Sequence, residues 1–290
     1  MRLTHKSQLF LYTALIIALC TVGMSVFERY SGLFFITALL CIYFIYKSFG
    51  QSIRRLNEEE ERKIRQLKQD MTGNIAHELR TPVTSIRGYL ETVLEQPLDE
   101  TQKEYFIRQA YNQTLVLSDL MQDMSLLTRM EEAAQSFKTE DILLGSLLTS
   151  VREDLSIALE EKDIDMQWNI PLGCVICGNR NLLYAVFRNL TDNTIRYAGE
   201  HIQIRIHLYT EDDEYYHLSY YDTGVGIPAG THLERLFERF YRISEGRTRD
   251  SGGTGLGLSI VKNAIALHQG SITVRNRVGG GLEFLIRLKK

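Results

Sequence analysis

Two long apolar runs, at residues 9–27 and 33–49, dominate the amino-terminal part of the chain. The first run carries no charged residue and approaches the roughly 20 residues that a helix needs to cross a bilayer. The second reaches a comparable length only if Lys47 extends its amine to the membrane surface. Basic residues precede the first run and follow the second, so the positive-inside rule favours a cytoplasmic position for both ends. We therefore expect a transmembrane hairpin with a short external turn at residues 28–32.

A cleaved signal peptide is the alternative interpretation of the first run. Its apolar core exceeds the usual length of a signal peptide, and no small-residue cleavage motif follows Met24. The pattern therefore favours an anchor that the mature protein retains.

Apolar residues recur at helical spacing from residue 51 onward, among arginine, lysine and glutamate. This pattern predicts a continuous helix, paired as a coiled coil in a signalling linker at residues 51–66. The periodicity continues to Val93, with an expected kink or weakened turn at Pro82, and a second amphipathic helix is predicted at residues 101–130. Two helices bury little apolar surface by themselves. We therefore expect residues 67–132 to form a four-helix bundle with a second copy of the chain.

Beyond residue 140 the hydrophobic pattern mixes two periods. The predicted strands lie at residues 202–208, 216–220, 272–275 and 282–288, and the predicted helices lie at residues 145–159, 182–195 and 258–268. Helices packed on one face of a mixed sheet form an α/β sandwich. We therefore expect a separate α/β domain at residues 140–290.

The composition argues against some classes of function. A formal net charge of −3 over 290 residues gives no electrostatic reason to expect nucleic acid as a partner. The four cysteines, Cys20, Cys41, Cys174 and Cys177, lack the spacing of a zinc site and do not indicate a disulfide framework. We expect them to be buried thiols without ligands.

His77 is the first residue with a distinctive chemical setting. It projects away from the apolar stripe of its predicted helix, which disfavours a structural role in the core. An exposed imidazole is largely neutral at pH 7 and nucleophilic. The adjacent Glu78 carboxylate can hold the other ring N–H or accept its proton. His77 is therefore a candidate nucleophile.

An asparagine-rich string lies on the predicted helix at residues 182–195. Residues 189–197 read NLTDNTIRY, in which Asn189 and Asn193 fall one turn apart on one face. Amide oxygens in this arrangement suit a hard Mg²⁺ ion, with Asp192 as a nearby base or water-orienting group. By itself the string is weakly specific, because asparagines on helices are usually polar surface.

Two glycine-rich strings follow in the chain. Residues 222–228 read DTGVGIP after a predicted strand, and residues 252–258 read GGTGLGL at the start of a predicted helix. Glycines allow positive φ angles and close approach of the backbone to a ligand. The Asp222 carboxylate can accept from the exocyclic amine of adenine and would repel the oxygen of guanine. The alternative for this first string is an ordinary strand-to-loop turn.

The second glycine string offers successive N–H groups at a helix start, an anion nest suited to a triphosphate. Its spacing fits neither a dinucleotide fingerprint nor a P-loop. Between the two glycine strings, residues 236–242 read LFERFYR. Phe237 and Phe240 fit equally well as plain core anchors. We expect Arg239 and Arg242 to belong to a mobile lid that is rich in Ser, Gly and Arg at residues 244–253. Arginines of such a lid can reach a γ-phosphate.

The order and spacing of these strings, from about residue 63 to the carboxy terminus, resemble those of sensor histidine kinases of two-component systems. Residues 77–82, HELRTP, resemble the phosphoacceptor box of that family. The later strings resemble its asparagine, first glycine, phenylalanine and second glycine boxes. Thr191 and Thr194 stand where Leu and Ala are usual, and Arg196 stands where Lys is common. These departures put the rate rather than the activity in question.

The resemblance implies a dimerisation and phosphotransfer domain followed by a gyrase-type (Bergerat) ATP-binding domain. It implies a kinase that phosphorylates its own His77 from ATP, with Mg²⁺ at Asn193, and passes the phosphoryl group to an aspartate of a separate response regulator. Glu78 followed by Thr81 marks phosphatase capability in the family. The implied catalytic residues are His77, Glu78, Thr81 and Asp192. The implied ATP-binding residues are Asn189, Asn193, Arg196, Tyr197, Asp222, Gly224, Gly226, Ile227, Arg239, Arg242, Gly253, Thr254, Gly255, Leu256 and Gly257.

The resemblance also implies partners and a location. We expect a homodimer, a response-regulator receiver domain and membrane lipid as partners. The five residues between the apolar runs are too few to enclose a ligand pocket, so we expect the stimulus to act within the bilayer, through a partner membrane protein or from the cytoplasmic side. The expected location is the bacterial cell (inner) membrane, with several spans and with the kinase domains in the cytoplasm.

Two alternatives stay open from the sequence. A gyrase-like ATPase used for conformational work would share the glycine strings, but it has no need of His77 in its own box. A degenerate kinase that serves as a membrane scaffold would dimerise without binding ATP, and the intact Asn193, Asp222 and Gly255 argue against it.

Overall fold

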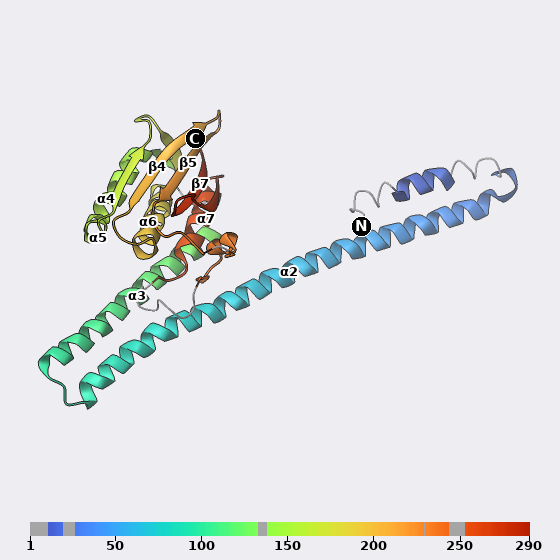
Figure 1. Ribbon diagram of the computed structural model, residues 1–290. Helices are drawn as coiled ribbons and strands as arrows, with labels where there is room; N and C mark the ends of the chain where they lie inside the picture. Colours follow the sequence, from blue (N-terminus) through green and yellow to red (C-terminus); the bar gives the residue numbers. More distant parts are fainter. Residues whose placement is uncertain (1–10, 20–26, 133–137, 229, 244–252) are drawn as a thin grey trace. The chain divides into compact units, whose positions relative to one another are not determined.

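The computed structural model describes residues 11–19, 27–132, 138–228, 230–243 and 253–290 (Figure 1). The chain divides into two compact units, Met1–Asp70 and Met71–Lys290. In the first unit, residues 11–19 are helical. Helix α2 (Phe27–Glu95) also begins there and extends into the second unit.

The predicted external turn at residues 28–32 is wrong, because α2 already starts at Phe27. This stretch contains no proline, and its single glycine, Gly32, costs a helix only about 1 kcal/mol. The connection before α2 falls on residues 20–26, outside the described residues. Among the helical segments that the structure describes, none has a window long and apolar enough to span a membrane. The hairpin of two spans therefore stays a prediction.

The two helices predicted for the phosphotransfer domain are confirmed as the end of α2 and as α3 (Glu100–Glu132). Helix α2 continues through Pro82 as one element and also contains the predicted linker. Helix α3 begins with a reciprocal capping pair, in which Gln102 N–H donates to Asp99 Oδ1 at 2.8 Å and Asp99 N–H donates to Gln102 Oε1 at 3.2 Å. The pairing of the linker as a coiled coil stays a prediction.

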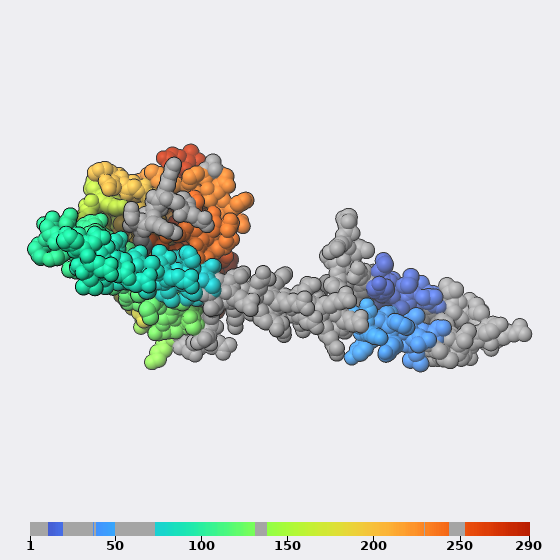
Figure 2. All heavy atoms as spheres, turned by 90° about the horizontal axis from the view of Figure 1, so that it is seen from below, coloured from blue at the N-terminus to red at the C-terminus, as the bar shows by residue number. Residues whose placement is uncertain are grey.

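Large apolar side chains remain exposed along this helical hairpin, whose surface is drawn in cyan to green in Figure 2. The residues that are more than 40% exposed are Val83, Leu90, Leu94, Tyr105, Ile107, Tyr111, Leu115 and Met121. So many exposed large apolar side chains on one pair of helices are typical of an interaction surface. The hairpin therefore has the surface expected of half of a four-helix bundle.

The carboxy-terminal domain contains a five-stranded mixed sheet in the order β2-β4-β5-β7-β6. Its strands are β2 (Asp165–Asn169), β4 (Gln203–Glu211), β5 (Tyr215–Asp222), β6 (Ser271–Asn276) and β7 (Leu282–Lys289). Only β2 and β4 pair in parallel; the other pairs are antiparallel. A separate two-stranded sheet pairs β1 (Glu140–Leu143) with β3 (Val175–Gly178). The four predicted strands are thus confirmed, and three short strands are additional.

The helices of this domain are α4 (Leu144–Asp154), α5 (Ser156–Glu161), α6 (Arg180–Tyr197) and α7 (Gly257–Leu267), with a 3₁₀ turn η1 (Leu233–Phe237). The single helix predicted at residues 145–159 is two helices that meet at Leu155. The break is slight, because the N–H of Leu159 still donates to the Leu155 carbonyl at 2.9 Å.

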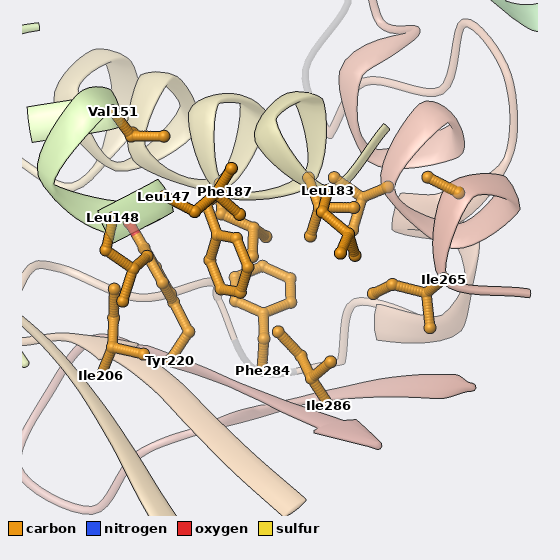
Figure 3. Close-up of a cluster of buried hydrophobic side chains, with 14 of the residues drawn as sticks. Leu147, Leu148, Val151, Leu183, Phe187, Ile206, Tyr220, Ile265, Phe284 and Ile286 are labelled. Carbon is orange, nitrogen blue, oxygen red and sulfur yellow. The ribbon is translucent and has the colours of Figure 1, made fainter. Parts of the chain in front are cut away.

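The core lies between one face of the five-stranded sheet and the helices α4, α6 and α7 (Figure 3). Phe187 of α6 packs there with Tyr220 of β5 and Phe284 of β7, and all three are at most 3% exposed. The alternation of buried with less buried positions along β4 and β7 places their apolar residues on this face, whereas β5 is buried at three consecutive positions, 218–220. The expected α/β sandwich is confirmed.

The cysteines are only partly as expected. Cys174 is buried, but Cys177 and Cys41 are exposed. Cys177 lies on β3 between the buried positions Ile176 and Gly178, so strand alternation directs the Cys177 thiol outward.

His268, directly after α7, connects the end of α7 to the start of α6. Its Nδ1 lies 2.7 Å from the carbonyl of Ala264, and its Nε2 accepts the N–H of Asn179 at 2.9 Å. The ring is buried against Gly178, where any side chain would collide with it. Since Nε2 must stay unprotonated to accept this bond, the neutral ring fits the site. Burial accordingly lowers the pKa of His268.

We predict that His268 makes the stability of the α/β domain depend on pH. The unfolded imidazole has a pKa of about 6.5, and the folded pKa is lower, so the unfolded chain takes up its proton first as the pH falls. The contribution of His268 is therefore complete above about pH 6.5 and is lost below it. Urea unfolding followed by the fluorescence of Trp168, the only tryptophan, should give a lower midpoint at about pH 5.5 than at about pH 7.5.

His268→Gln should flatten this pH dependence, whereas the same replacement of the exposed His232 should not change it. An equally steep dependence in His268→Gln would contradict the assignment.

Candidate functional site

Helix α6 supplies one wall of the candidate site. It begins after Asn179, whose side-chain oxygen caps the helix by accepting a backbone N–H at 3.0 Å. Phe187 and Leu190 are fully buried against the sheet. The helical period then places Asn189 and Asn193 together at the edge of that buried face, where they line a cavity.

This cavity has a volume of about 510 Å³, a size that suits a cofactor or nucleotide. Its walls come from α6, from the loops after β5 and before α7, from residues 236–243 and from α3. The predicted residues that line it are Asn189, Asp192, Asn193, Arg196, Tyr197, Asp222, Gly226, Ile227, Arg242, Gly253, Thr254, Gly255 and Gly257. Gly224, Arg239 and Leu256 lie outside the lining. The four sequence strings therefore meet at one place in the fold.

The two asparagines of α6 have different surroundings. Within the described part of the chain, the buried Nδ2 of Asn193 has no hydrogen-bond partner. Such a group costs free energy unless a ligand completes it. Asn189 instead donates to the carbonyl of Ala185 at 2.8 Å and lies against Gly257 at the start of α7. Of the two, Asn193 has the amide left for a ligand.

Asp222, the last residue of β5, lines the cavity although it is only 3% exposed. Its Oδ1 accepts the N–H of Gly224 at 2.8 Å and the N–H of Leu282 at 3.4 Å. These two bonds orient the carboxylate. Burial raises the pKa of Asp222, and the N–H groups oppose that rise.

The glycines of the loop after β5 have two separate roles. A side chain at Gly224 would collide with the carbonyl of Ala198, the same carbonyl that accepts the N–H of Val225 at 3.0 Å. Gly224 thus allows the loop to lie against the end of α6. Gly226 has a φ of +66°, which favours glycine. The loop is therefore shaped by glycine at both positions.

The two unusual threonines of α6 have a common partner. The hydroxyl of Tyr220, fully buried in β5, lies 3.1 Å from Thr194 Oγ1 and 3.5 Å from Thr191 Oγ1. A buried hydroxyl without a partner would cost about 1–3 kcal/mol. The three hydroxyls therefore satisfy one another between α6 and β5. Burial raises the pKa of Tyr220, and the threonine hydroxyls oppose that rise.

The loop before α7 is paired with residues of the phenylalanine string. The N–H of Phe240 donates to the carbonyl of Gly255 at 2.9 Å, and Gly255 has a φ of +70°. Thr254 Oγ1 accepts the N–H of Leu256 at 3.2 Å. Leu256 is fully buried. Its side chain therefore belongs to the core rather than to the predicted ATP-binding set.

Phe237 acts as a core anchor, with its ring centroid 6.4 Å from that of Phe284. Phe240 is also packed against the core. Arg242 lines the cavity. The predicted lid falls almost entirely on residues 244–252, which lie outside the described residues.

Helix α3 forms a wall of the cavity that the sequence did not predict. Asp119, Gln122, Asp123 and Leu126 line it. The hydroxyl of Thr254 donates to Asp123 Oδ2 at 2.8 Å. Burial raises the pKa of Asp123, and this hydrogen bond opposes the rise. The sequence predicted α3 and α7 as helices. The contact between α3 and the loop before α7 depends on how the helical hairpin packs against the α/β domain, and no local sequence pattern indicates that packing.

Asp192, the predicted base, also lines the cavity. Burial raises its pKa, and the positive charges of Arg196 and Arg188 oppose the rise. Arg188 Nε lies 4.0 Å from Asp192 Oδ2. The carboxyl is therefore half-buried beside two guanidinium groups.

His77 lies on α2 and does not line the cavity. Its side chain is 67% exposed, and its Nδ1 lies 3.6 Å from Glu78 Oε1. The hydroxyl of Thr81 donates to the His77 carbonyl at 3.2 Å. The ring thus stands in solvent with one nitrogen facing a carboxylate, as the sequence pattern predicts.

Both domains match known families. Residues 67–133 match the His Kinase A (phospho-acceptor) domain, and residues 178–290 match the histidine kinase-, DNA gyrase B- and HSP90-like ATPases. The chain belongs to the sensor histidine kinases of two-component systems. In this kinase the first match contains His77, and the second contains the cavity residues of α6 and of both glycine loops.

Relatives among characterised proteins agree. The chain is 32% identical over 223 residues to the phosphate regulon sensor protein PhoR of Pseudomonas aeruginosa, covering 77% of this kinase and 50% of PhoR. It is 34% identical over 227 residues to the sensor histidine kinase RppB of Synechocystis, covering 77% and 49%. The chain thus spans about half the length of these relatives.

Two solved structures also resemble this kinase. The Acinetobacter baumannii histidine kinase AdeS matches with a TM-score of 0.59 and 25% identity, over 73% of this chain and 97% of that one. The histidine kinase ThkA in complex with the response regulator protein TrrA matches with a TM-score of 0.60 and 26% identity, over 81% and 66%.

We predict that Asp222→Asn weakens ATP binding by about 1–3 kcal/mol. The N–H groups of Gly224 and Leu282 would keep the amide oxygen, so the amide nitrogen, which only donates, would face the adenine amine. Calorimetric titration of the full chain with ATP measures the loss. The exposed Asp213 in the β4–β5 turn gives the matched control, Asp213→Asn. If the parent and Asp222→Asn bound ATP with equal affinity, Asp222 would have no role in ATP binding.

Proposed function

We propose that this protein binds ATP in the cavity, phosphorylates its own His77 and passes the phosphoryl group to an aspartate of a separate response regulator. The observation that carries the proposal is the convergence of Asn193, Asp222 and the loop before α7 on one cavity, in a chain that also exposes His77 beside Glu78. The family matches over both domains support it.

In this proposal each part of ATP meets a different group of cavity residues. The oriented carboxylate of Asp222 suits the exocyclic amine of adenine. The loop at residues 253–257 offers N–H groups and the start of α7 to the phosphates. Arg242 lines the same cavity and suits a γ-phosphate, and Arg239 is close in sequence. The unpaired Nδ2 of Asn193 is a donor that suits a phosphate oxygen. The Oδ1 of the same amide would hold a magnesium ion, which would supply charge neutralisation on the phosphates.

The chemistry at His77 follows from its two ring nitrogens. With Nδ1 protonated and facing Glu78, the lone pair of Nε2 attacks the γ-phosphorus. The P–Nε2 bond forms while the P–O bond to ADP breaks, and the bridging oxygen keeps the electron pair. Nδ1 then gives its proton to Glu78, or to Asp192 if that residue approaches as the base. Because His77 does not line the cavity, the α/β domain must move to bring the phosphate to it.

The second transfer moves the phosphoryl group from Nε2 to a carboxylate oxygen of the regulator. The solved complex of ThkA with TrrA supports a regulator as the partner. In the proposed phosphatase activity, Thr81, one turn beyond His77, orients a water that hydrolyses the aspartyl phosphate of the regulator. The bond between Thr81 and the His77 carbonyl holds its hydroxyl on the same side of α2.

A homodimer is part of the proposal. The exposed apolar residues of the hairpin, such as Val83, Leu90 and Tyr111, need a partner surface. A second copy supplies the same helices and completes a four-helix bundle.

The membrane anchor is also part of the proposal. The apolar runs at residues 9–27 and 33–49 support an inner-membrane location of a bacterial cell, with the kinase domains in the cytoplasm. Lipid contact and a sensory partner within the membrane are proposed together with this anchor. Cell fractionation tests this: the chain should stay with membranes after washing at high salt and alkaline pH, and release by either wash would contradict the anchor.

We predict that His77→Gln abolishes acid-labile labelling from γ-labelled ATP and leaves ATP affinity unchanged, because the ring is exposed outside the cavity. His201→Gln, a replacement of another exposed histidine, is the matched control and should label normally. Persistent labelling of His77→Gln would identify a different acceptor.

Thr81→Ala separates the two activities in the same assay. It should label like the parent but remove phosphate from the purified phospho-regulator more slowly. An unchanged rate of dephosphorylation would reject the role of Thr81.

A further inference from the structure

The side chain of Asn276 makes two hydrogen bonds to one residue of the loop after β5. Asn276 ends β6, and its Oδ1 accepts the N–H of Ile227 at 3.0 Å, while its Nδ2 donates to the carbonyl of Ile227 at 2.8 Å. A carboxamide that uses both its acceptor and its donor on one residue fixes the position and direction of that backbone. Ile227 lines the cavity and Asn276 does not. Asn276 therefore holds the site from outside.

The turn that follows Asn276 packs against the beginning of the same loop. Gly281 has a φ of +88°, and any side chain there would collide with the backbone carbonyl of Asp222. At Gly280, a Cβ atom would lie 2.9 Å from the carbonyl oxygen of Gly224. The N–H of Leu282 donates to Asp222 Oδ1. The β6–β7 turn thus contacts the loop near Asp222, while Asn276 bonds to its other half.

The second half of the loop needs such support. Residues 223–228 form neither helix nor strand. The first half is bonded to α6 through Val225 and to the Asp222 carboxylate through Gly224. Gly226, with its freedom of φ, then separates this half from Ile227. The two bonds from Asn276 restrict the part of the loop beyond that glycine.

We propose that Asn276 is a positioning residue for recognition of the adenine base. It holds Ile227 and Gly226, two lining residues, in a fixed relation to the Asp222 carboxylate. A purine held between the loop and Asp222 then meets a surface of one shape, which favours adenine over guanine. This inference rests on the proposed function of the cavity. The two side-chain hydrogen bonds of Asn276 go to the loop after β5 and not to the loop before α7, so we expect it to affect base binding and not the transfer of the phosphoryl group.

The test compares Asn276→Ala with the parent as full chains, by calorimetric titration with ATP and GTP and by initial rates of autophosphorylation. We expect the Kd and KM for ATP to rise roughly three- to tenfold, as the loss of two exposed hydrogen bonds implies. We expect kcat to stay unchanged, because the lost interaction concerns binding. The preference for ATP over GTP should fall.

Asn276→Asp sharpens the test, because a carboxylate still accepts the Ile227 N–H but cannot donate to the Ile227 carbonyl. It should lose at least as much ATP affinity as Asn276→Ala. Val278→Ala, at a fully exposed position of the same turn, is the matched control and should behave as the parent. Urea unfolding by Trp168 fluorescence shows that each variant is folded.

The outcomes are distinct. An unchanged KM and an unchanged ATP-to-GTP ratio in both Asn276 variants would overturn the inference while ATP binding by the parent upholds the proposed function. Loss of kcat together with a lower unfolding midpoint would also overturn it, because the role of Asn276 would then be structural. A parent chain that binds no ATP would overturn the proposed function and this inference with it.

Discussion

The burial of one side of α6 against the mixed sheet is the interaction on which the nucleotide site depends. Phe187 and Leu190 are fully buried there, and this fixes the rotation of the helix about its axis. With the rotation fixed, Asn193 can only face the cavity, at the edge where β5 delivers Asp222. We expect ATP and its metal ion to interact with Asn193 and Asp222. Packing in the core thus sets the distance between these two residues. A cavity-forming change at Phe187 would disturb the site without touching it.

The contact between α6 and the sheet also explains why the threonines of α6 are compatible with this fold. Thr194 Oγ1 donates to the Leu190 carbonyl at 3.2 Å, but a lone tyrosine at position 220 would bury its hydroxyl without a partner. The threonine hydroxyls lie within hydrogen-bonding distance of Tyr220 and so give it partners between α6 and β5. Tyr220 lies two residues before Asp222 along β5, so these hydroxyl contacts connect the polar end of the strand to α6. The departures from the family pattern are therefore matched to one another within this chain.

The features that depend on hydrophobic periodicity and on local chemistry could be predicted from the sequence. The exposure of His77, the placement of Asn193 on α6 and the four longer strands all follow from side chains within one element. The contacts that the sequence did not predict join elements distant in the chain. Asn276 meets Ile227, and Asp123 meets Thr254, across separations that leave no local signal. The wrong turn at residues 28–32 has a different cause: a weak helix breaker such as a single glycine does not end a helix that neighbouring turns support.

The contact between α3 and the loop before α7 has a consequence for the proposed activity. A hydroxyl has one proton, so Thr254 cannot donate to Asp123 and to a phosphate oxygen at the same time. Asp119 and Asp123 also place carboxylates on a cavity in which a triphosphate would carry like charge. If ATP binds as proposed, it therefore competes with this docking of α3, and by linkage the docking weakens ATP binding to the same extent. Any movement of the phosphotransfer helices that withdraws α3 from the cavity would thus raise the affinity for nucleotide and free the domain to approach His77.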